Sequence, residues 1–335
     1  MFVLKPIKKY FLVLLTLLMP VIVPAQDAGV MTAYQQELQK LFDKVFHAPT
    51  DNERYNANEQ ATTLFKEAEQ QPGAFNWDWQ LGREVSVLKS KDKAFRIITW
   101  AVVRDNGEYE CFGLMEVAGE GDAINCYTLH DKSDDIINVE ESVLSPDNWY
   151  GAVYQDIIET KYEGKTYYTL LGWTGVDALT QRKVIEPVRF RGSAMKPEFG
   201  QNLFRRDKNR RRVVLEYSNS AMVNLQYDEQ FVRTFENKRM KGKKGRIINV
   251  QQQHDEKAKM IIFDEIGPMV LGMDGLFQYY VPTGTEKAYV FTDGRWEMQG
   301  YAFGEDPNEK LNKEFAPIPK KTPAYQQHRP SGDEK

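Results

Sequence analysis

The chain has 335 residues, of which 41% are hydrophobic and 27% are charged, with 44 basic and 48 acidic side chains. This composition excludes a disordered or collagen-like polymer and is sufficient for a sizeable buried core. The length allows one large all-β domain or two smaller domains.

The N-terminus has the pattern of a secretory signal peptide. Three lysines precede an apolar run over 11–23, and small residues up to Ala25 follow it, as at a cleavage site. A retained membrane anchor is the weaker alternative, because Pro20 and Pro24 interrupt the run before the ~20 apolar residues that span a bilayer. We therefore expect residues 1–25 to be removed and the protein to be periplasmic or secreted.

Removal of this segment would leave a mildly acidic protein. Residues 1–25 contain three lysines and no acid, so 41 basic and 48 acidic groups remain, a net charge of −7. A general nucleic-acid binder presents a basic face, so we expect no nucleic-acid partner. No second long apolar run follows, and the mature chain should have no transmembrane segment.

Two helices are predicted next. Over 30–46, apolar side chains recur at three- and four-residue spacing. Thr50 followed by Glu53 resembles a capping box for a second helix that ends near residue 70. The first apolar stripe includes Leu38, Leu41 and Val45. We expect the stripe to pack within the protein, whereas an exposed stripe would indicate a docking element.

From about residue 84 the apolar period changes to two, which indicates strands. Asn106-Gly107, Glu163-Gly164 and Asp293-Gly294 are tight-turn signals between runs of aromatic and β-branched residues. Further strands are expected near 183–190, 202–206, 211–217, 221–227 and 258–264. We predict a mainly β fold, an antiparallel meander of hairpins preceded by two short helices. A propeller-like ring, a sandwich and a barrel remain open as architectures.

The predicted chain organisation has four parts: the signal peptide 1–25, a helical segment 26–75, a β-meander domain 76–303 and a tail 304–335. Residues 228–257 are polar and lysine-rich, and we interpret them as a loop or insertion in the β domain. The tail contains five prolines, which block regular ladders and predict an extended end.

Cys111 and Cys126 are the two cysteines of the chain. An exported protein with two cysteines favours a disulfide. A two-residue loop at 106–107 and a reversal at 118–119 would place the two residues opposite each other on neighbouring strands. We therefore predict a disulfide between them, with two free buried thiols as the alternative.

Motifs that carry chemistry are missing from the sequence. The four histidines form no His-Glu-x-x-His pair, and no Gly-x-Ser-x-Gly elbow or phosphate-binding glycine loop occurs. Asp131, Ser133 and Asp135 alternate as in a calcium loop, but Ile136 stands where an EF-hand requires glycine. We expect no cofactor, no metal and no catalytic role.

Asp156 is the one weak catalytic candidate. In the register set by a turn at 163–164, it faces Leu171 and lies near Tyr154 and Trp173. A carboxylate among apolar neighbours must be hydrogen-bonded or shifted in pKa. It would be either a general acid or a structural acid, and we favour the structural role.

Aromatic residues supply one set of binding candidates. Trp149, Tyr150 and Trp173 belong to aromatic-rich stretches and would stack on a sugar if they were exposed. Aromatic side chains on strands more often pack in a core or pair across strands.

Basic residues supply the other set. Arg210, Arg211 and Arg212 end a basic cluster over 205–212, and a second basic cluster lies over 238–246. Either cluster would hold an envelope polyanion. A solvated turn or loop explains such clusters equally well.

Stretches 147–154, 168–173 and 197–200 resemble a group of uncharacterised exported proteins of Gram-negative bacteria. The similarity extends through Tyr217-Ser218 to Asp264, over the β domain rather than the helices. It implies export and one contiguous β unit, and it implies no activity, because the group has none assigned.

The sequence thus predicts an exported, non-catalytic binding or scaffold module of the periplasm or cell envelope, with an unknown ligand. One alternative is an envelope hydrolase that acts on glycan or peptide. Another is an accessory subunit of an envelope complex that docks through its N-terminal helices.

Overall fold

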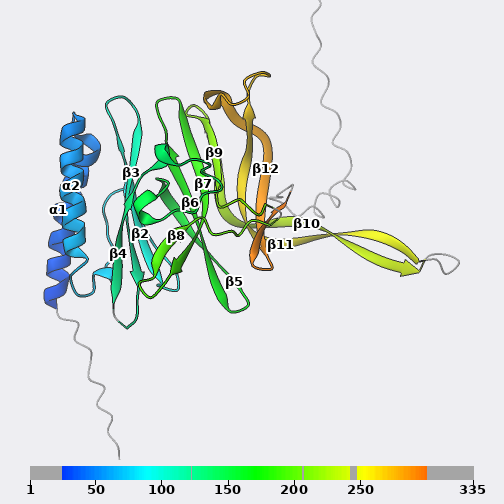
Figure 1. Ribbon diagram of the computed structural model, residues 1–335, viewed down its shortest axis with the longest axis horizontal. Coiled ribbons are helices and arrows are strands. Elements are labelled where there is room, and N and C mark those ends of the chain that lie inside the picture. The colour runs from blue at the N-terminus through cyan, green and yellow to red at the C-terminus, as the bar shows by residue number, and fades with distance from the viewer. Residues whose placement is uncertain (1–24, 122, 206, 242–246, 300–335) are drawn as a thin grey trace, which may run out of the picture.

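A computed structural model describes residues 25–121, 123–205, 207–241 and 247–299. The expected signal peptide, up to residue 24, and the proline-rich tail lie outside these residues. The described chain forms four layers, seen from left to right in Figure 1: a pair of helices and then three antiparallel sheets. None of the helices within the described ranges is long and apolar enough to cross a membrane.

The helical layer consists of α1 (Ala25–His47) and α2 (Asp51–Ala68). Thr50 caps α2 as the sequence predicts, because its hydroxyl accepts a hydrogen bond from the Glu53 amide at 3.4 Å. Leu38, Leu41 and Val45 are buried. The apolar stripe of α1 therefore packs inside the protein and is not available as an exposed docking element.

The three sheets follow each other along the chain, and every strand pair is antiparallel. The first sheet contains β1 (Ser86–Lys89), β2 (Phe95–Val103), β3 (Tyr109–Ala118) and β4 (Ile124–His130). The central sheet contains β5 (Val153–Tyr162), β6 (Lys165–Gly175), β7 (Thr180–Arg191), β8 (Lys196–Phe199) and β9 (Val213–Ser218). The outer sheet contains β10 (Leu225–Lys241), β11 (Ile247–Pro268), β12 (Tyr280–Thr292) and β13 (Arg295–Gln299).

Buried apolar side chains fill the three spaces between these layers. Trp100 and Phe42 lie between the helices and the first sheet, with ring centroids 5.2 Å apart. Tyr154 lies between the first and central sheets, and Trp296 lies between the central and outer sheets. The fold is therefore mainly β, as the sequence predicts. It is sandwich-like, and the described strands close no barrel.

A buried ionic cluster joins the helices to the first sheet. The Arg96 guanidinium donates to Glu69, next to the end of α2, at 2.7 Å, and to Glu116 on β3. It also donates to the Trp77 carbonyl at 2.9 Å. Arg96 and Glu116 are almost fully buried. One cation therefore holds two carboxylates beneath the helices.

The loop between β2 and β3 differs from the predicted two-residue turn. Gly107 has a φ of 85°, whereas Asn106 is not in the left-handed region. The Arg104 amide donates to the Glu108 carbonyl at 2.8 Å, which encloses a three-residue loop. The extra residue pairs Cys111 with Ala101 instead of Val102. A one-residue slip turns every side chain of a strand to the other face, so the predicted faces of β3 were wrong.

The predicted disulfide is also wrong, and both cysteines are free. The reversal after β3 is longer than predicted, so Cys126 pairs with Glu116. Cys111 points to the central sheet, where its sulfur lies 3.4 Å from the Thr174 hydroxyl. Odd and even positions of β3 face opposite sides, so Cys111 and Cys126 lie on different faces of the first sheet.

This arrangement predicts how the two thiols react. Unfolded without reductant, the protein should bind two molecules of iodoacetamide, as measured by mass spectrometry. In the native protein Cys126 should react first, because it is exposed, whereas Cys111 is buried and burial raises the pKa of its thiol further than that of Cys126. If neither the unfolded nor the native protein reacts with iodoacetamide, the structure is contradicted and the disulfide prediction is supported.

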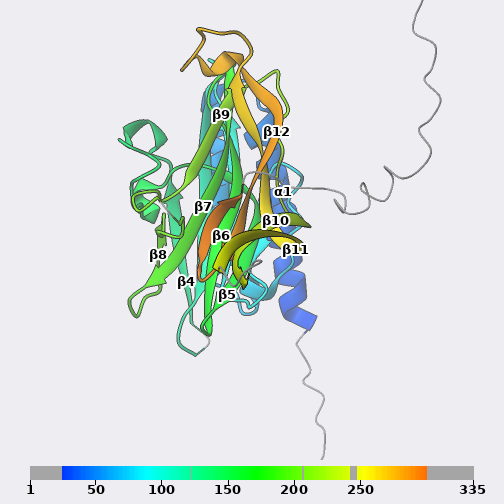
Figure 2. The ribbon, with the colours of Figure 1, turned by 90° about the vertical axis from the view of Figure 1, so that its right-hand side faces the viewer.

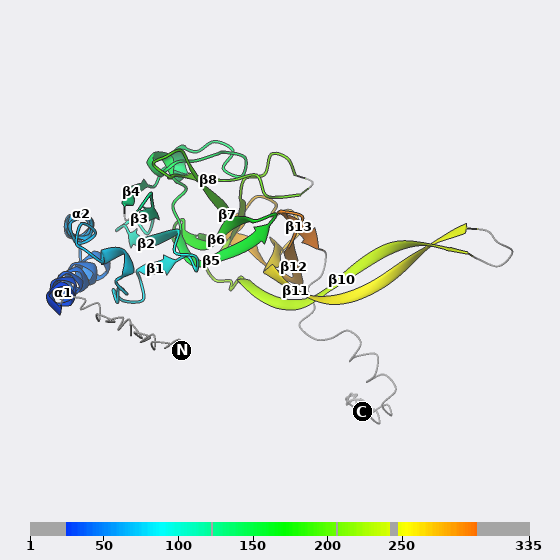
Figure 3. The same cartoon turned by 90° about the horizontal axis from the view of Figure 1, so that it is seen from below.

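The sequence predicts a loop or insertion over 228–257. In the structure this polar segment is part of a long two-stranded ribbon. Strands β10 and β11 pair from Leu225 opposite Phe263 to Lys241 opposite Ile247. Figures 1 and 3 show this ribbon projecting from the outer sheet. A ribbon that leaves the body has no core to face, so no apolar alternation marks its strands. Residues 238–241 of the second basic cluster end β10, and residues 242–246 lie outside the described residues.

The strand predicted at 202–206 is reduced to one bridge, between Phe204 and Trp296. The other strands predicted from the alternating pattern are present, although β10 begins at Leu225 rather than near residue 221. The turns at 163–164 and 293–294 have positive φ at both central residues, as the predicted turn type requires.

Candidate functional site

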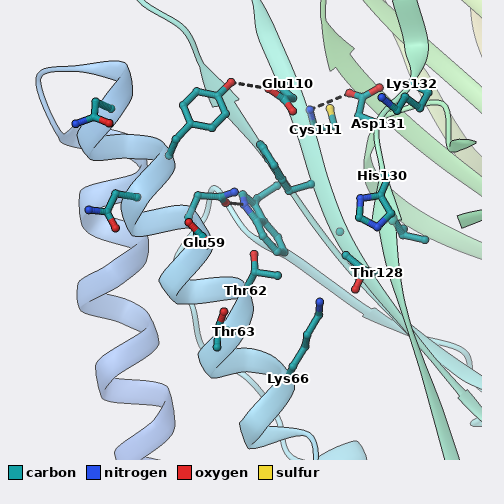
Figure 4. Close-up of a pocket in the computed structure, with 18 residues that line it drawn as sticks. Glu59, Thr62, Thr63, Lys66, Glu110, Cys111, Thr128, His130, Asp131 and Lys132 are labelled. Carbon is teal, nitrogen blue, oxygen red and sulfur yellow. Dashed lines mark hydrogen bonds between the residues drawn. The ribbon is translucent and has the colours of Figure 1, made fainter. Parts of the chain in front are cut away.

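A groove of about 770 Å³ lies between α2 and strands β3 and β4. Figure 4 shows Thr62, Thr63 and Lys66 on α2 facing Thr128 and His130 of β4 across it. We call this hollow the α2–β4 groove. Its walls come from segments that lie about 65 residues apart in the sequence.

The groove arises because the two helices do not cover the whole of the first sheet. They pack on β2 and β3 through Trp100, Val102 and Leu114. The Trp100 indole donates to Asn58 of α2 at 2.7 Å, which fixes the helix above the sheet. Strand β4 lies beyond β3 at the edge of the first sheet, so the helices leave its helix-side face open. This face forms the second wall of the groove.

A hydrogen-bonded network closes one end of the α2–β4 groove. The Tyr55 hydroxyl donates to Glu110 at 2.6 Å and accepts from Arg104 Nε at 3.0 Å. Arg104 also donates to Glu110 at 2.7 Å. Burial, and then the hydrogen bond to Glu110, raise the pKa of Tyr55 to about 12. Tyr55 therefore stays a protonated donor, and one carboxylate oxygen of Glu110 is held by two protein donors.

Asp131 closes the groove at the end of β4 and is fully occupied. Its carboxylate accepts from the amides of Cys111 at 2.9 Å, Ser133 at 2.9 Å and Gly151 at 3.3 Å. The Ser133 hydroxyl donates to it at 2.6 Å. A Cβ at Gly151 would lie 2.0 Å from the carboxylate, so only glycine fits. The calcium-loop pattern at 131–135 is thus a structural turn, and the described residues contain no metal-ligand cluster.

The remaining polar side chains of the groove are open. Within the described residues, the side chains of Glu59, Thr62, Thr63, Lys66 and His130 make no hydrogen bond or ion pair with the protein. They offer hydroxyl, carboxylate, ammonium and imidazole groups around the half-buried rings of Tyr55 and Phe112. The rings lie 6.1 Å apart in an edge-to-face arrangement. The groove thus combines polar groups with an apolar floor.

Two smaller hollows continue the α2–β4 groove across the first and central sheets. Glu110, Asp131 and Lys132 line both the groove and a hollow of about 250 Å³. Ser133 and Arg182 line both that hollow and a third of about 370 Å³. The three hollows therefore lie next to each other, with Glu110, Asp131 and Lys132 between the first two and Ser133 and Arg182 between the last two.

The aromatic residues proposed as a platform take structural positions. Trp149 is buried and donates from its indole to the Tyr154 hydroxyl at 2.9 Å. Tyr150 is buried and lines the third hollow. Trp173 is half-buried, donates to Gln181 at 2.6 Å and packs on Tyr109. An exposed stacking platform made of these residues is therefore wrong, because Trp149 and Tyr150 are buried and Trp173 is half-buried against Tyr109.

Two of the three arginines proposed for a polyanion are paired with acids within the protein. Arg212 is fully buried and donates to Glu186 at 2.6 Å. Arg210 pairs with Asp207 at 2.8 Å and with Glu140 at 3.2 Å. Arg211 is half-buried beside them. Arg210 and Arg212 tie the segment after β8 to the loop before β5, so neither is a free basic group.

Asp156 pairs with Leu171, as predicted. A bulge between Tyr154 and Asp156 then turns Tyr154 to the opposite face. Asp156 is half-buried and faces the outer sheet, where its charge contributes to raising the pKa of Tyr227 behind the larger effect of burial. It does not line the α2–β4 groove, and no second acid is paired with it in the described hollows.

The sequence reading missed the groove residues. Glu59, Thr62, Thr63 and Lys66 form the polar face of a helix that was read only for its buried side. The hydroxyls on that face could have indicated a polar site in the sequence. They do not indicate which strand lies opposite the helix. Comparison of the chain with family models, with curated proteins and with solved structures gives no match.

Proposed function

We propose that the protein is a non-catalytic binding module of the cell envelope and that the α2–β4 groove holds a segment of a neutral glycan chain. The observation that carries this proposal is the groove itself, with free hydroxyl and charged side chains around two aromatic rings. Sugar hydroxyls match such donors and acceptors, and the apolar faces of sugar rings pack on aromatic side chains.

The shape of the site supports a chain rather than a compact molecule as the ligand. The adjoining hollows extend the groove from α2 across β4 towards Arg182. A polymer segment would contact several of these hollows at once. The expected export of the protein is consistent with an envelope glycan, and the ligand class remains the proposal to be tested.

The acids of the groove favour binding over glycan hydrolysis. Glycosidases use two carboxyl groups that flank the scissile bond. Of the three acids that line the groove, Glu110 and Asp131 are held by protein donors. Glu59 alone is left open, so the pair that hydrolysis needs is not assembled.

Blocking the groove should abolish glycan binding. Native electrophoresis in gels cast with soluble galactomannan, xylan, starch or hydroxyethyl cellulose should show retarded migration in at least one polysaccharide. Thr62→Arg places a long side chain across the groove and should weaken the retardation at least about tenfold. Gln36→Arg on the exposed face of α1 adds the same charge away from the groove and should migrate like the original protein.

Unretarded migration in all four gels, or equal effects of Thr62→Arg and Gln36→Arg, would contradict this proposal. Release of reducing ends from a retarding polysaccharide would instead support the hydrolase alternative. Retention by heparin alone would support a polyanion as the ligand.

A further inference from the structure

The connection between β11 and β12, residues 269–279, presents three exposed aliphatic side chains in succession. We call it the apolar loop. Leu271 is 98% exposed, Met269 is 66% exposed and Val270 is 57% exposed. Figures 1 and 2 show the loop at the upper end of the molecule, beyond the ends of the strands. Such a group of exposed aliphatic residues marks an interaction site.

The apolar loop is a folded turn. Gly272 and Gly275 have φ of 87° and 81°, which lets the chain reverse twice. The Met269 amide donates to the Tyr279 carbonyl at 2.9 Å, across the base of the loop. Further bonds inside the loop run from Met273 to Val270, from Leu276 to Met273, from Tyr279 to Leu276 and from Gly275 to the Tyr280 hydroxyl.

These internal hydrogen bonds lower the cost of moving the loop from water into an apolar medium. A segment that leaves water must satisfy its main-chain amides and carbonyls internally, because lipid provides no partners. The apolar loop satisfies several of its amides without using other parts of the protein. It can therefore be buried in an apolar medium at a smaller cost than an open loop of the same length.

The order of side chains along the loop matches the profile of a bilayer surface. The first turn of the loop, which the bond from Met273 to Val270 closes, carries Leu271, and we call this turn the apex. Phe277 and Tyr279, which are partly exposed, lie where the loop joins β12. Aromatic rings favour the boundary between lipid tails and water. Leu179 and Met222, also exposed, lie in turns at the same end, next to the paired residues Thr180 and Ser218.

A second copy of the chain fits this surface poorly. A stable dimer buries about 800 Å² on each partner over a broad and complementary patch. The apolar loop is a narrow projection of eleven residues, from 269 to 279, and its apex is convex. A narrow apolar projection is what a lipid surface can accept, because the bilayer deforms around it.

From these observations we infer that the apolar loop inserts its apex into the surface of a lipid bilayer and holds the protein there. The loop contains one acid, Asp274, and no lysine or arginine. Attachment therefore depends on apolar burial and not on attraction to anionic lipid. This inference is argued from other observations than the glycan proposal: the α2–β4 groove and the loop share no residue, and Phe277 is the loop residue that also lines the third hollow.

Flotation with vesicles tests the inference. The full chain should rise with vesicles of pure phosphatidylcholine, and neither high salt nor added phosphatidylglycerol should change the bound fraction. Leu271→Asp should reduce the vesicle-bound fraction at least about tenfold, because it puts a charge where the inserted loop would bury a leucine in lipid. Ile137→Asp changes a residue that is 82% exposed in a different loop and should float like the unchanged protein.

Circular dichroism should show that both variants are folded, since neither residue is buried in the protein. The inference is overturned if the unchanged protein stays below the vesicles, or if both variants lose binding equally. It is also overturned if binding requires anionic lipid and disappears in salt. A dimer seen by light scattering that Leu271→Asp disperses, without vesicle binding, would assign the loop to a second copy.

Discussion

Replacing Arg212 with leucine should lower the free energy of unfolding by about 3–5 kcal/mol, because it leaves the carboxylate of Glu186 buried without its cation. Both side chains are fully buried, and Arg212 Nε lies 2.6 Å from Glu186 Oε1. Arg212 also donates to the Val139 carbonyl, which ties the loop before β5 to the central sheet. Urea unfolding followed by tryptophan fluorescence measures the change.

The size of this effect follows from a chain of buried polar groups. Glu186 accepts a second hydrogen bond from the Tyr154 hydroxyl, which itself accepts from the Trp149 indole at 2.9 Å. Burial and the neighbouring Glu186 raise the pKa of Tyr154, so it remains a donor. Loss of Arg212 therefore disturbs the polar core of the central sheet as well as one ion pair.

Two comparisons separate a buried charge from a general effect of losing arginine. Arg191→Leu removes an exposed arginine that pairs with Glu198 at 2.8 Å and should cost about 1 kcal/mol or less. The double variant Arg212→Leu/Glu186→Leu should be more stable than Arg212→Leu alone, because it removes the unpaired carboxylate. A double variant that is less stable than Arg212→Leu would contradict this account.

Replacing Arg96 with leucine should lower the free energy of unfolding by about 3–5 kcal/mol at neutral pH and loosen the helices from the first sheet. Arg96 is the cation between Glu69 and Glu116, and all three side chains are buried. Without it, two carboxylates would face each other below α2. Urea unfolding and near-ultraviolet circular dichroism of the packed tryptophans report the loss of stability and of helix packing.

The deficit of the Arg96 variant should depend on pH in a defined direction. Burial raises the pKa of Glu69 above its usual range even beside Arg96, and removal of Arg96 takes away a group that lowers it. A carboxyl whose pKa is raised by folding stabilises the native state below its unfolded pKa and loses that contribution as the pH rises through the folded value. The deficit should therefore be smallest near pH 4 and grow towards neutral pH.

Arg83→Leu serves as the control for this second prediction, since Arg83 is exposed before β1. It should change stability by less than about 0.5 kcal/mol at either pH. A deficit of the Arg96 variant that stays constant between acid and neutral pH would show that the buried carboxylates are not its cause.

The two predictions change the reading of the basic residues in this chain. In the sequence, Arg212 belongs to a basic cluster that resembles a polyanion site. Arg96 lies within an apolar strand, and no sequence feature singles it out. In the structure both are internal cations that hold layers together. A cluster of charges in the sequence does not reveal which of them are buried, because the partner acids are distant in the chain. Glu186 lies 26 residues from Arg212, and Glu69 lies 27 residues from Arg96.

The loop at 105–107 shows how one residue decides a whole face. The Asn106-Gly107 pair predicts a two-residue turn, but a three-residue loop with Gly107 alone in the left-handed region forms instead. This loop allows Trp100 and Phe112 to stack under the helices, with ring centroids 6.2 Å apart. Packing against α1 and α2 therefore selects the register, and the predicted cysteine pairing fails with it.

Local properties of the chain by themselves determined the helices, their cap at Thr50, most strands and the turn that places Asp156 opposite Leu171. These features depend on neighbours a few residues apart, which a sequence displays directly. The register of β3, the burial of Arg96 and Arg212, and the α2–β4 groove were decided only by the tertiary structure. They depend on which layer covers which face, and that choice is made by contacts between segments distant in sequence.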